Sequence, residues 1–285
     1  MSYKISIITV NFNNKVGLQK TIASVLSQTF KNFEFIIVDG ASTDGSKALL
    51  ADGNLETTKW ISEPDNGIYH AMNKGIKMSK GDYLLFLNSG DALINDEVLH
   101  MLDQKIDSTY DIYYGDIIFD QAEKTTKIIF PERLTFGFFF RDNLSHQATF
   151  IKRSLFNKYF YYNEKFKIVS DWEFLIYVIC KENVSYKHLN LITTLYDGNG
   201  ISSKSNNYKT VYDERATSLA QHFPAFVKDY ENISKLETRR MKQILRIQKS
   251  SIAWGMLKVF VKMIFFFLPK QKSTPEKDTI QRIPL

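Results

Sequence analysis

Acids, amides and glycines cluster directly after four strand-like segments in the N-terminal half of the chain. The clusters occupy residues 11–14, 39–45, 63–67 and 88–91. Each follows a short run rich in β-branched or aromatic residues, which is typical of a buried strand. In an open α/β sheet the ligand lies beyond the carboxyl ends of the strands, so four such loops in succession predict one binding site at a single edge of a sheet.

The elements that must position these loops alternate between strands and helices. Strands are expected at residues 4–10, 34–38, 59–62 and 83–87, and helices at residues 46–50, 68–77 and 97–102. This alternation predicts an α/β domain with a mostly parallel, doubly wound sheet flanked by helices. Paired strands at 112–119 and 126–130, a helix at 171–181 and a strand at 184–196 should complete a domain that spans residues 1–232.

Charge separates this domain from the C-terminal tail. Eleven lysines and arginines against three acids give residues 236–285 a net charge of +8, and because the whole chain carries +6, residues 1–235 carry −2. The domain is therefore not expected to bind nucleic acid. The single cysteine, Cys180, forms no internal disulfide, and the first residues lack a signal-peptide pattern. Both features predict a cytoplasmic protein.

Seven segments in order along residues 4–200 resemble glycosyltransferase family 2. They are SIITVNFNN (6–14), TIASVLSQTF (21–30), EFIIVDGASTDGS (34–46), DNGIYHAMNKG (65–75), GDYLLFLNSGD (81–91), HQATF (146–150) and SDWEF (170–174). The resemblance implies the GT-A fold and transfer of a sugar from a nucleotide donor with inversion at the anomeric carbon. It also implies bacterial cell-surface polysaccharide synthesis, in which polyprenyl-linked sugars are common acceptors.

The resemblance assigns a nucleotide-sugar site to the loops. Asp39 is expected at the nucleotide base because a carboxylate at a strand end accepts hydrogen bonds from N–H or O–H donors, although it could simply form a turn. Asp44 is expected in the same site, with helix capping as the alternative, and Asn66 could likewise be a cap. The expected site comprises Asn11, Asn13, Asp39, Asp44, Asp65, Asn66, Gly67, Asn73 and Ser89.

Asp91 is the expected ligand of a divalent metal, Mn²⁺ or Mg²⁺. Negative charge develops on the donor diphosphate as its bond to the anomeric carbon breaks, and a cation between carboxylate and diphosphate stabilises that charge. The Asp-x-Asp motif of the family reads Ser89-Gly90-Asp91 here, so its first carboxylate is missing. The alternative is that residues 88–91 form only a turn.

Asp171 matches the catalytic base of the family, which takes the proton of the acceptor hydroxyl in one in-line displacement. The alternative is an N-terminal helix cap, and Glu173 is the second candidate base. His146 is assigned to the acceptor or the diphosphate, with a structural role as the alternative. Asp116 is expected to contact sugar, unless it only ends a strand.

The tail, residues 233–285, is expected to be basic, helical and amphipathic. Its segment 251–268 combines Trp254 and several phenylalanines with Lys258 and Lys262 on one stripe. A membrane-spanning helix would bury both lysines at a cost of roughly 2.5–3.5 kcal/mol each. A helix lying in the membrane surface avoids this cost, so peripheral docking at the inner face of the cell membrane is expected. Packing on the domain and a homodimer contact are the alternatives.

These features together predict an inverting glycosyltransferase that moves a sugar from a UDP-linked donor to a glycan or polyprenyl-linked acceptor. A nucleotidyltransferase is the alternative enzyme, but residues 11–14 contain none of the glycines of a phosphate-binding loop. An inactive or scaffolding homologue is the non-enzymatic alternative, because the incomplete metal motif could mark lost activity.

Overall fold

The computed structural model describes residues 4–52, 58–121, 124–198, 207–236 and 238–268. The chain divides into two units, residues 1–227 and residues 228–285, which are described separately below. The division falls within helix α9 (Pro224–Leu236). Residues 269–285 of the expected tail lie outside the described residues.

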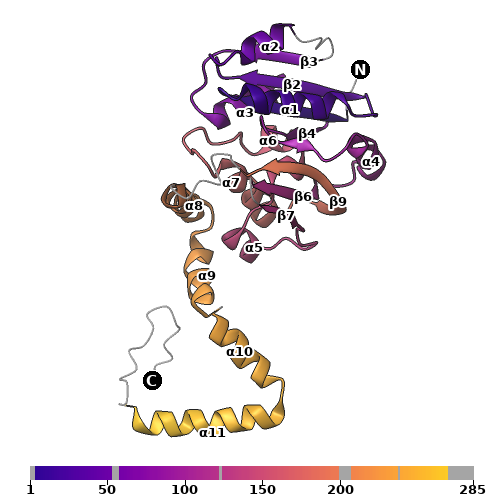
Figure 1. Ribbon diagram of the computed structural model, residues 1–285. Coiled ribbons are helices and arrows are strands. Elements are labelled where there is room, and N and C mark those ends of the chain that lie inside the picture. The colour runs from indigo at the N-terminus through magenta and orange to yellow at the C-terminus, as the bar shows by residue number, and fades with distance from the viewer. Residues whose placement is uncertain (1–3, 53–57, 122–123, 199–206, 237, 269–285) are drawn as a thin grey trace. The chain divides into compact units, whose positions relative to one another are not determined.

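One β-sheet runs through the first unit (Figure 1). Its first half is parallel, in the order β3 (Thr58–Ser62), β2 (Phe33–Asp39), β1 (Ile5–Asn11) and β4 (Tyr83–Phe86). The order continues through β8 (Thr149–Lys152), β6 (Ile112–Gln121), β9 (Tyr186–Asp197) and β5 (Ala92–Leu93), while β7 (Lys124–Ile128) pairs with β6. Strand β8 is antiparallel to both of its neighbours, so this half of the sheet is mixed rather than parallel.

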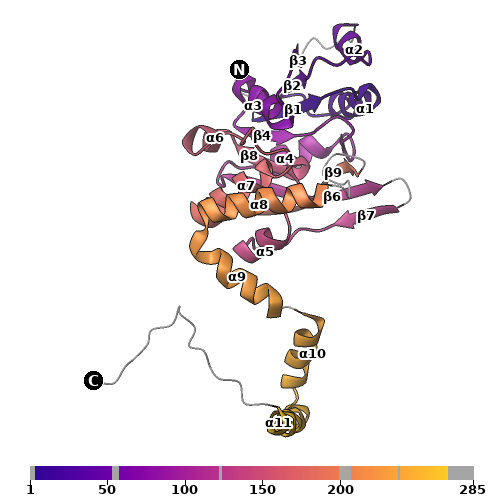
Figure 2. The same ribbon diagram turned by 90° about the vertical axis from the view of Figure 1, so that its left-hand side faces the viewer.

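Helices cover both faces of the sheet because alternate residues of the strands point to opposite sides. On one face Ile7 and Ile37 belong to a core shared with α1 (Lys15–Leu26), α2 (Ser46–Asp52) and α4 (Val98–Lys105). On the other face Ile8 and Val38 share a core with α3 (Ile68–Met78), α5 (Phe136–Arg141), α6 (Ser154–Lys158), α7 (Ser170–Ile176) and α8 (Tyr208–His222). Figure 2 looks onto α8, which lies beside α7.

Two elements differ from the sequence expectation, and a third, helix α5, forms where no element is expected. The aromatic stretch at 136–140 forms helix α5, which begins where the Thr135 hydroxyl accepts a hydrogen bond from Phe138 N at 3.1 Å. The helix expected at 171–181 is α-helical only through Ile176 and continues as a π-helical turn over Tyr177–Lys181. Strand β7 ends at Ile128 because Phe130 N donates to the Asp116 carboxylate at 3.0 Å instead of continuing the ladder.

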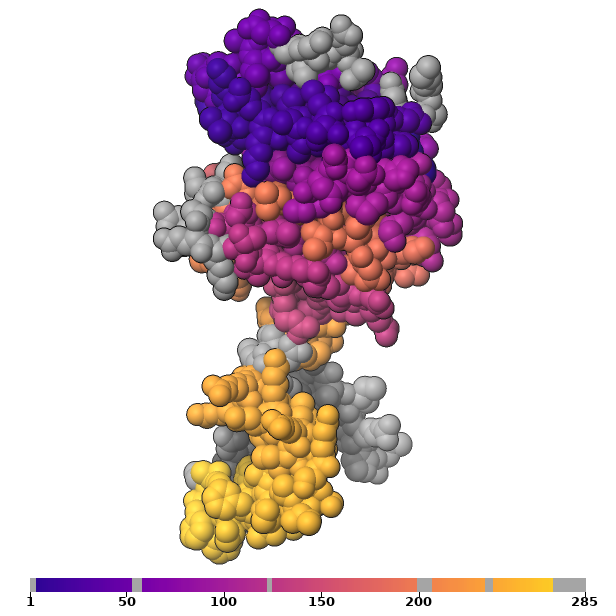
Figure 3. Space-filling model, turned by 45° about the vertical axis from the view of Figure 1, so that its right-hand side comes forward, coloured from indigo at the N-terminus to yellow at the C-terminus, as the bar shows by residue number. Residues whose placement is uncertain are grey.

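The second unit continues as helices α10 (Arg239–Gln248) and α11 (Ser251–Phe267). Each begins at a capping hydroxyl, Thr238 for α10 and Ser250 for α11. Both helices are described in full, and neither contains a buried residue. Figure 3 shows the side chains of α11, in yellow, at the surface. Among the described helices, none has the length and apolar character that crossing a membrane requires.

Candidate active site

A cavity of about 1250 Å³ opens at the carboxyl ends of the parallel strands and extends to α7. Its volume exceeds the roughly 300–1,000 Å³ of common ligand pockets. Several of the expected site residues line it, from loops far apart in the sequence: Asn11, Asp65, Gly67, Ser89, Asp91, His146 and Asp171. The polar strand ends therefore do meet at one site, as the sequence predicts.

Asp39 fixes the loop after β2 from inside the fold. The side chain is fully buried. Its Oδ1 accepts hydrogen bonds from Asn11 Nδ2 at 2.7 Å and from Ser42 Oγ at 2.6 Å. Its Oδ2 accepts hydrogen bonds from Ser62 Oγ at 2.7 Å and from Ser42 N at 3.0 Å. Burial raises the pKa of Asp39, but hydrogen bonds from Ser42, Ser62 and Asn11 outweigh burial and lower it. These bonds fill the acceptor positions of the carboxylate. Its contact with a nucleotide base stays a prediction.

Asn11 is the member of this network that lines the cavity. Its Oδ1 is buried and has no hydrogen-bond partner in the described part of the chain. A buried amide oxygen without a donor is costly, and a nucleotide N–H is the kind of group that satisfies it.

Asn13 and Asp44 join the loops after β1 and β2 without lining the cavity. Asn13 adopts a φ of 49°, and its Oδ1 accepts a hydrogen bond from Thr43 N at 2.8 Å. Asp44 accepts from Ser46 Oγ at 2.6 Å and from Lys15 N at 2.7 Å. The hydrogen bond from Ser46 is the main reason that the pKa of Asp44 is lowered. These bonds agree with the capping alternative, and a contact of Asp44 with the nucleotide stays a prediction.

The loop before α3 presents Asp65 and Gly67 to the cavity. Asp65 forms an ion pair with Lys74 at 2.6 Å. Gly67 has a φ of 117°, which favours glycine, and no atom lies within 4 Å of the place where its Cβ would stand. A ligand can therefore approach this backbone closely. Gly67, and not Asn66, is the N-cap of α3.

Asn66 and Asn73 do not line the cavity. Asn66 is exposed. The Asn73 amide is buried and holds the backbone of Tyr162, with Nδ2 donating to the carbonyl at 2.8 Å and Oδ1 accepting from the N–H at 3.0 Å. Its side chain thus bonds to the backbone of the fold, and its contact with the donor stays a prediction.

Asp91 lies in the cavity wall after β4 and is only 3% exposed. Burial raises its pKa to about 6, against the lowering effects of a hydrogen bond from Asp197 N and of His146 and Gln147. Asp197, at the end of β9, also lines the cavity, and its Oδ2 lies 2.7 Å from the position of a Cβ on Gly90. Any larger residue at position 90 would collide with this carboxylate.

The groups around Asp91 fit a divalent cation. Ser89 Oγ is buried with no partner in the described chain, and the Asp91 and Asp197 carboxylates are the hard oxygen ligands that Mg²⁺ and Mn²⁺ prefer. The described residues contain no group of three or more His, Cys, Asp or Glu side chains that could hold a metal alone. A donor diphosphate would therefore complete the coordination.

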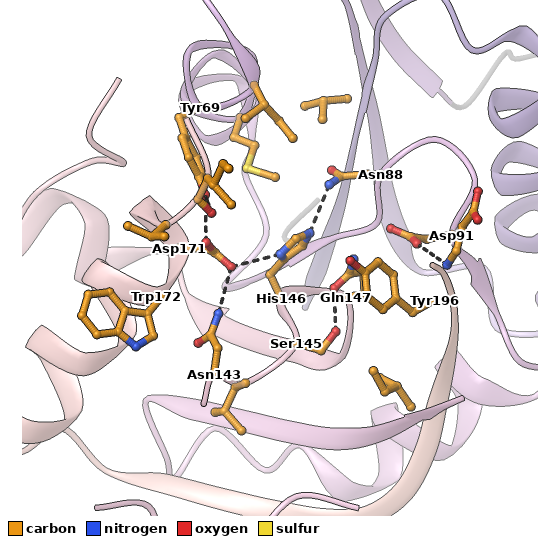
Figure 4. Close-up of a pocket in the computed structure, with 18 of the residues that line it drawn as sticks. Tyr69, Asn88, Asp91, Asn143, Ser145, His146, Gln147, Asp171, Trp172 and Tyr196 are labelled. Carbon is orange, nitrogen blue, oxygen red and sulfur yellow. Dashed lines mark hydrogen bonds and ion pairs between the residues drawn. The ribbon is translucent and has the colours of Figure 1, made fainter. Parts of the chain in front are cut away.

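Asp171 lies in the cavity at the start of α7, held by three side chains (Figure 4). Tyr69 OH donates to Oδ1 at 2.8 Å, while Asn143 Nδ2 and His146 Nδ1 both lie 3.2 Å from Oδ2. Burial raises the pKa of Asp171, but hydrogen bonds from His146 and Tyr69 and the charge of His146 outweigh burial and lower it. The lowered pKa favours the ionised form that a general base requires, and the catalytic role of Asp171 stays a prediction.

His146 bridges the two sides of the site. Its Nδ1 faces Asp171, and its Nε2 lies 3.1 Å from Asn88 Nδ2, next to Ser89. Figure 4 shows the imidazole between the Asp171 and Asn88 side chains. A position between the expected base and the expected diphosphate site agrees with either role predicted for His146.

Glu173 and Asp116 both interact with other residues inside the fold, and neither lines the cavity. Glu173 Oε1 lies 3.3 Å from His222 Nε2 on α8. Asp116 Oδ1 accepts from Phe130 N at 3.0 Å and lies 2.8 Å from His188 Nε2. The carboxylate of Asp116 therefore links β6 to β9, and the sugar contact expected for it stays a prediction.

The sequence profile described as Glycosyl transferase family 2 matches residues 6–167. This chain belongs to glycosyltransferase family 2. The family 2 enzyme is 30% identical over 198 residues to the PGL/p-HBAD biosynthesis glycosyltransferase of Mycobacterium bovis, covering 67% of this chain and 76% of that one. It is 22% identical over 210 residues to the UDP-Glc:alpha-D-GlcNAc-diphosphoundecaprenol beta-1,3-glucosyltransferase WfgD of Escherichia coli, covering 73% and 82%.

Solved structures confirm the expected GT-A fold of the family 2 enzyme. TarS 1-349 of S. aureus in complex with UDP-GlcNAc matches with a TM-score of 0.61 at 18% identity, over 77% of this chain and 67% of that chain. The mannosyltransferase PcManGT of Pyrobaculum calidifontis, in complex with GDP-Man and Mn²⁺, matches at 0.56 and 13% identity, over 93% and 81%. The enzyme covers only 36% of a longer TarS chain.

Proposed function

We propose that this glycosyltransferase transfers a sugar, with inversion, from a UDP-linked donor to a glycan or polyprenyl-linked acceptor in cell-surface polysaccharide synthesis. The observation that carries the proposal is the single cavity that holds both Asp91 and Asp171. Figure 4 shows the two carboxylates well apart, with His146 between them. An in-line displacement needs this separation, because the leaving group departs opposite the attacking hydroxyl.

The proposed reaction is one displacement. The acceptor oxygen bonds to the anomeric carbon as the bond from that carbon to the diphosphate breaks, and the acceptor proton passes to the Asp171 carboxylate. Tyr69, Asn143 and His146 hold that carboxylate in place. Asp91 and Ser89 would hold a divalent cation, which supplies charge stabilisation at the diphosphate when bound.

The donor and acceptor classes rest on the relatives. The name of WfgD specifies a UDP-linked glucose donor and a diphosphoundecaprenol-linked acceptor, and a TarS structure contains UDP-GlcNAc. PcManGT instead contains GDP-Man. UDP is therefore the proposed nucleotide, and GDP is the alternative that the experiment below must include.

Membrane docking by the tail is part of the same proposal. Helix α11 exposes large apolar side chains, with Phe266 85% and Phe267 82% exposed. An exposed apolar helix next to the basic α10 suits the boundary of an anionic membrane, where a lipid-linked acceptor would lie. We place the enzyme at the cytoplasmic face, in agreement with the lone cysteine of the chain.

Donor turnover and product configuration test the proposal. The full-length protein would be incubated with Mn²⁺ and a panel of UDP-linked and GDP-linked sugars, with and without lipid-linked acceptors. We expect binding and slow hydrolysis of a UDP-sugar, and an inverted anomeric centre in the NMR spectrum of the product. Retention of configuration would refute the displacement, and failure to bind any donor would favour an inactive homologue.

A further inference from the structure

The cavity contains a cation that the proposed reaction does not use. Arg215, on α8, lines the cavity, and its guanidinium carbon lies 4.8 Å from the centre of the Trp172 ring. Trp172 is buried, and its indole N–H donates to Phe139 O at 2.7 Å, so the ring is a fixed platform. A guanidinium stacked on an aromatic face keeps its N–H edge available for a planar anion.

The donors of Arg215 are nearly unused in the described part of the chain. A guanidinium has five N–H donors. The one hydrogen bond found runs from Nη2 to Asp142 O at 3.4 Å, which is long for this type. Arg215 Nε is buried and has no partner among the described residues. The Asp171 and Asp142 carboxylates lie near enough to offset part of the charge of Arg215, but they leave most of its N–H donors unused. Because a buried N–H without an acceptor costs free energy, this geometry fits a ligand that brings planar oxygen acceptors, such as a phosphate.

An apolar wall lies beside Arg215 in the same cavity. It is formed by β6, β7, the loop after β7 and α8, with Ile117, Ile128, Ile129, Phe130, Pro131 and Val211. Val211 precedes Arg215 by one helical turn, so this part of the wall lies beside the guanidinium, and the remaining wall residues line the same cavity. Ile129 is 57% exposed although it is apolar. A hydrocarbon chain would cover this surface.

We propose that Arg215 and this wall form the acceptor subsite, which binds the phosphate or diphosphate and the adjoining hydrocarbon of a lipid-linked acceptor. This inference rests on the proposed function, in which Asp171 receives the proton of the acceptor. Trp172, the platform of Arg215, follows Asp171 directly in α7. The anion is thus held beside the base, whereas the donor diphosphate is expected at Asp91.

Binding of three probes to the full-length protein tests the subsite. Calorimetry would compare farnesyl diphosphate, farnesol and UDP. We expect Arg215→Gln to weaken farnesyl diphosphate binding by about tenfold, the effect of losing charge-assisted hydrogen bonds, while UDP binding is unchanged. The matched control is Arg133→Gln, an exposed arginine outside the cavity, which should change neither affinity.

The apolar wall is tested independently of Arg215. Ile129→Ser should weaken both farnesyl diphosphate and farnesol and leave UDP binding unchanged. Val16→Ser is its control, because Val16 is 78% exposed and lies outside the cavity. Since Ile129 is largely exposed, this variant should fold even if Arg215→Gln does not. Circular dichroism melting would verify the fold of each variant.

The outcomes separate the two sources of a phosphate ligand. Loss of UDP affinity in Arg215→Gln, with farnesyl diphosphate unaffected, would assign the guanidinium to the donor and overturn the proposal. Equal losses for farnesyl diphosphate and farnesol in Arg215→Gln, or unchanged binding in Ile129→Ser, would also overturn it. If the wild type binds farnesyl diphosphate but transfers sugar to no lipid-linked acceptor, the proposed function fails while the subsite stands.

Discussion

Two acids on α7 offer a sharp test of the catalytic base. Asp171 and Glu173 are both buried, but only Asp171 lines the cavity. Asp171→Asn keeps the size of the side chain, and its amide oxygen can still accept the hydrogen bond from Tyr69 OH, now 2.8 Å long. The substitution removes the proton acceptor, and the amide NH2 that replaces Oδ2 also ends the hydrogen bonds from Asn143 and His146. Because the side chain keeps its size and the hydrogen bond from Tyr69, we expect a folded protein that binds donor normally.

The expected loss of rate follows from the role of a base. General base catalysis contributes about 100- to 10,000-fold, so kcat for Asp171→Asn should fall by this factor. The fall corresponds to an increase of about 2.7–5.4 kcal/mol in activation free energy. The KM for the sugar nucleotide should change little, because Asp171 lies on α7, away from the strand ends where the nucleotide is expected.

Glu173→Gln is the matched control for this experiment. It weakens the pairing of Glu173 with His222, at 3.3 Å, and should lower the melting temperature. It should leave kcat nearly unchanged, because the side chain does not reach the cavity. The assay is release of nucleotide in the presence of acceptor, with circular dichroism to verify folding. Equal losses of kcat in both variants, or near-normal kcat in Asp171→Asn, would refute the assignment of the base.

Three further predictions concern stability, metal binding and docking. Because the pKa of Asp39 is lowered, its ionised form stabilises the fold at pH values above the usual pKa of an aspartate. This contribution is lost as the pH falls through the pKa of the folded state. The difference in urea midpoint between the wild type and Asp39→Asn should therefore shrink from pH 7 toward pH 3. Because the pKa of Asp91 is about 6, protons should compete with Mn²⁺, and calorimetry should show weaker binding at pH 5.5 than at pH 7.5, with the pH dependence reduced in Asp91→Asn. Replacing the exposed Phe266 and Phe267 by Asp should reduce cosedimentation with anionic vesicles, and unchanged cosedimentation would contradict docking through α11.

The sequence locates the parallel half of the fold well because each buried strand is a continuous apolar run. The strand expected at 83–87, for example, is observed at Tyr83–Phe86. The loops after these strands are also located correctly, because each begins where the apolar run of its strand ends. Polarity alone, however, does not show which way a side chain points. Asn73 is as polar as Asn11, yet its side chain bonds to the backbone of Tyr162, 89 residues away, and does not line the cavity.

The residues that the sequence does not reveal are those brought in by long-range packing. Asp197 lies 106 residues from Asp91, the residue to which its backbone donates. Arg215 is placed by the packing of α8 against α7 and stacks on Trp172. No local spacing marks either residue, because each depends on the tertiary contact and not on its neighbours in the chain.

Helix α3 connects the two ends of the cavity mechanically. Its N-cap, Gly67, lies in the loop where the donor is expected, while Tyr69 OH shares its single proton between Asp171 Oδ1 at 2.8 Å and Ile168 O at 2.5 Å. Because a short helix moves as a rigid body, a donor that shifts the Gly67 backbone would also shift the tyrosine that orients the base. Donor occupancy and alignment of the base are then coupled, and ordered binding, with the nucleotide sugar before the acceptor, is the expected kinetic consequence.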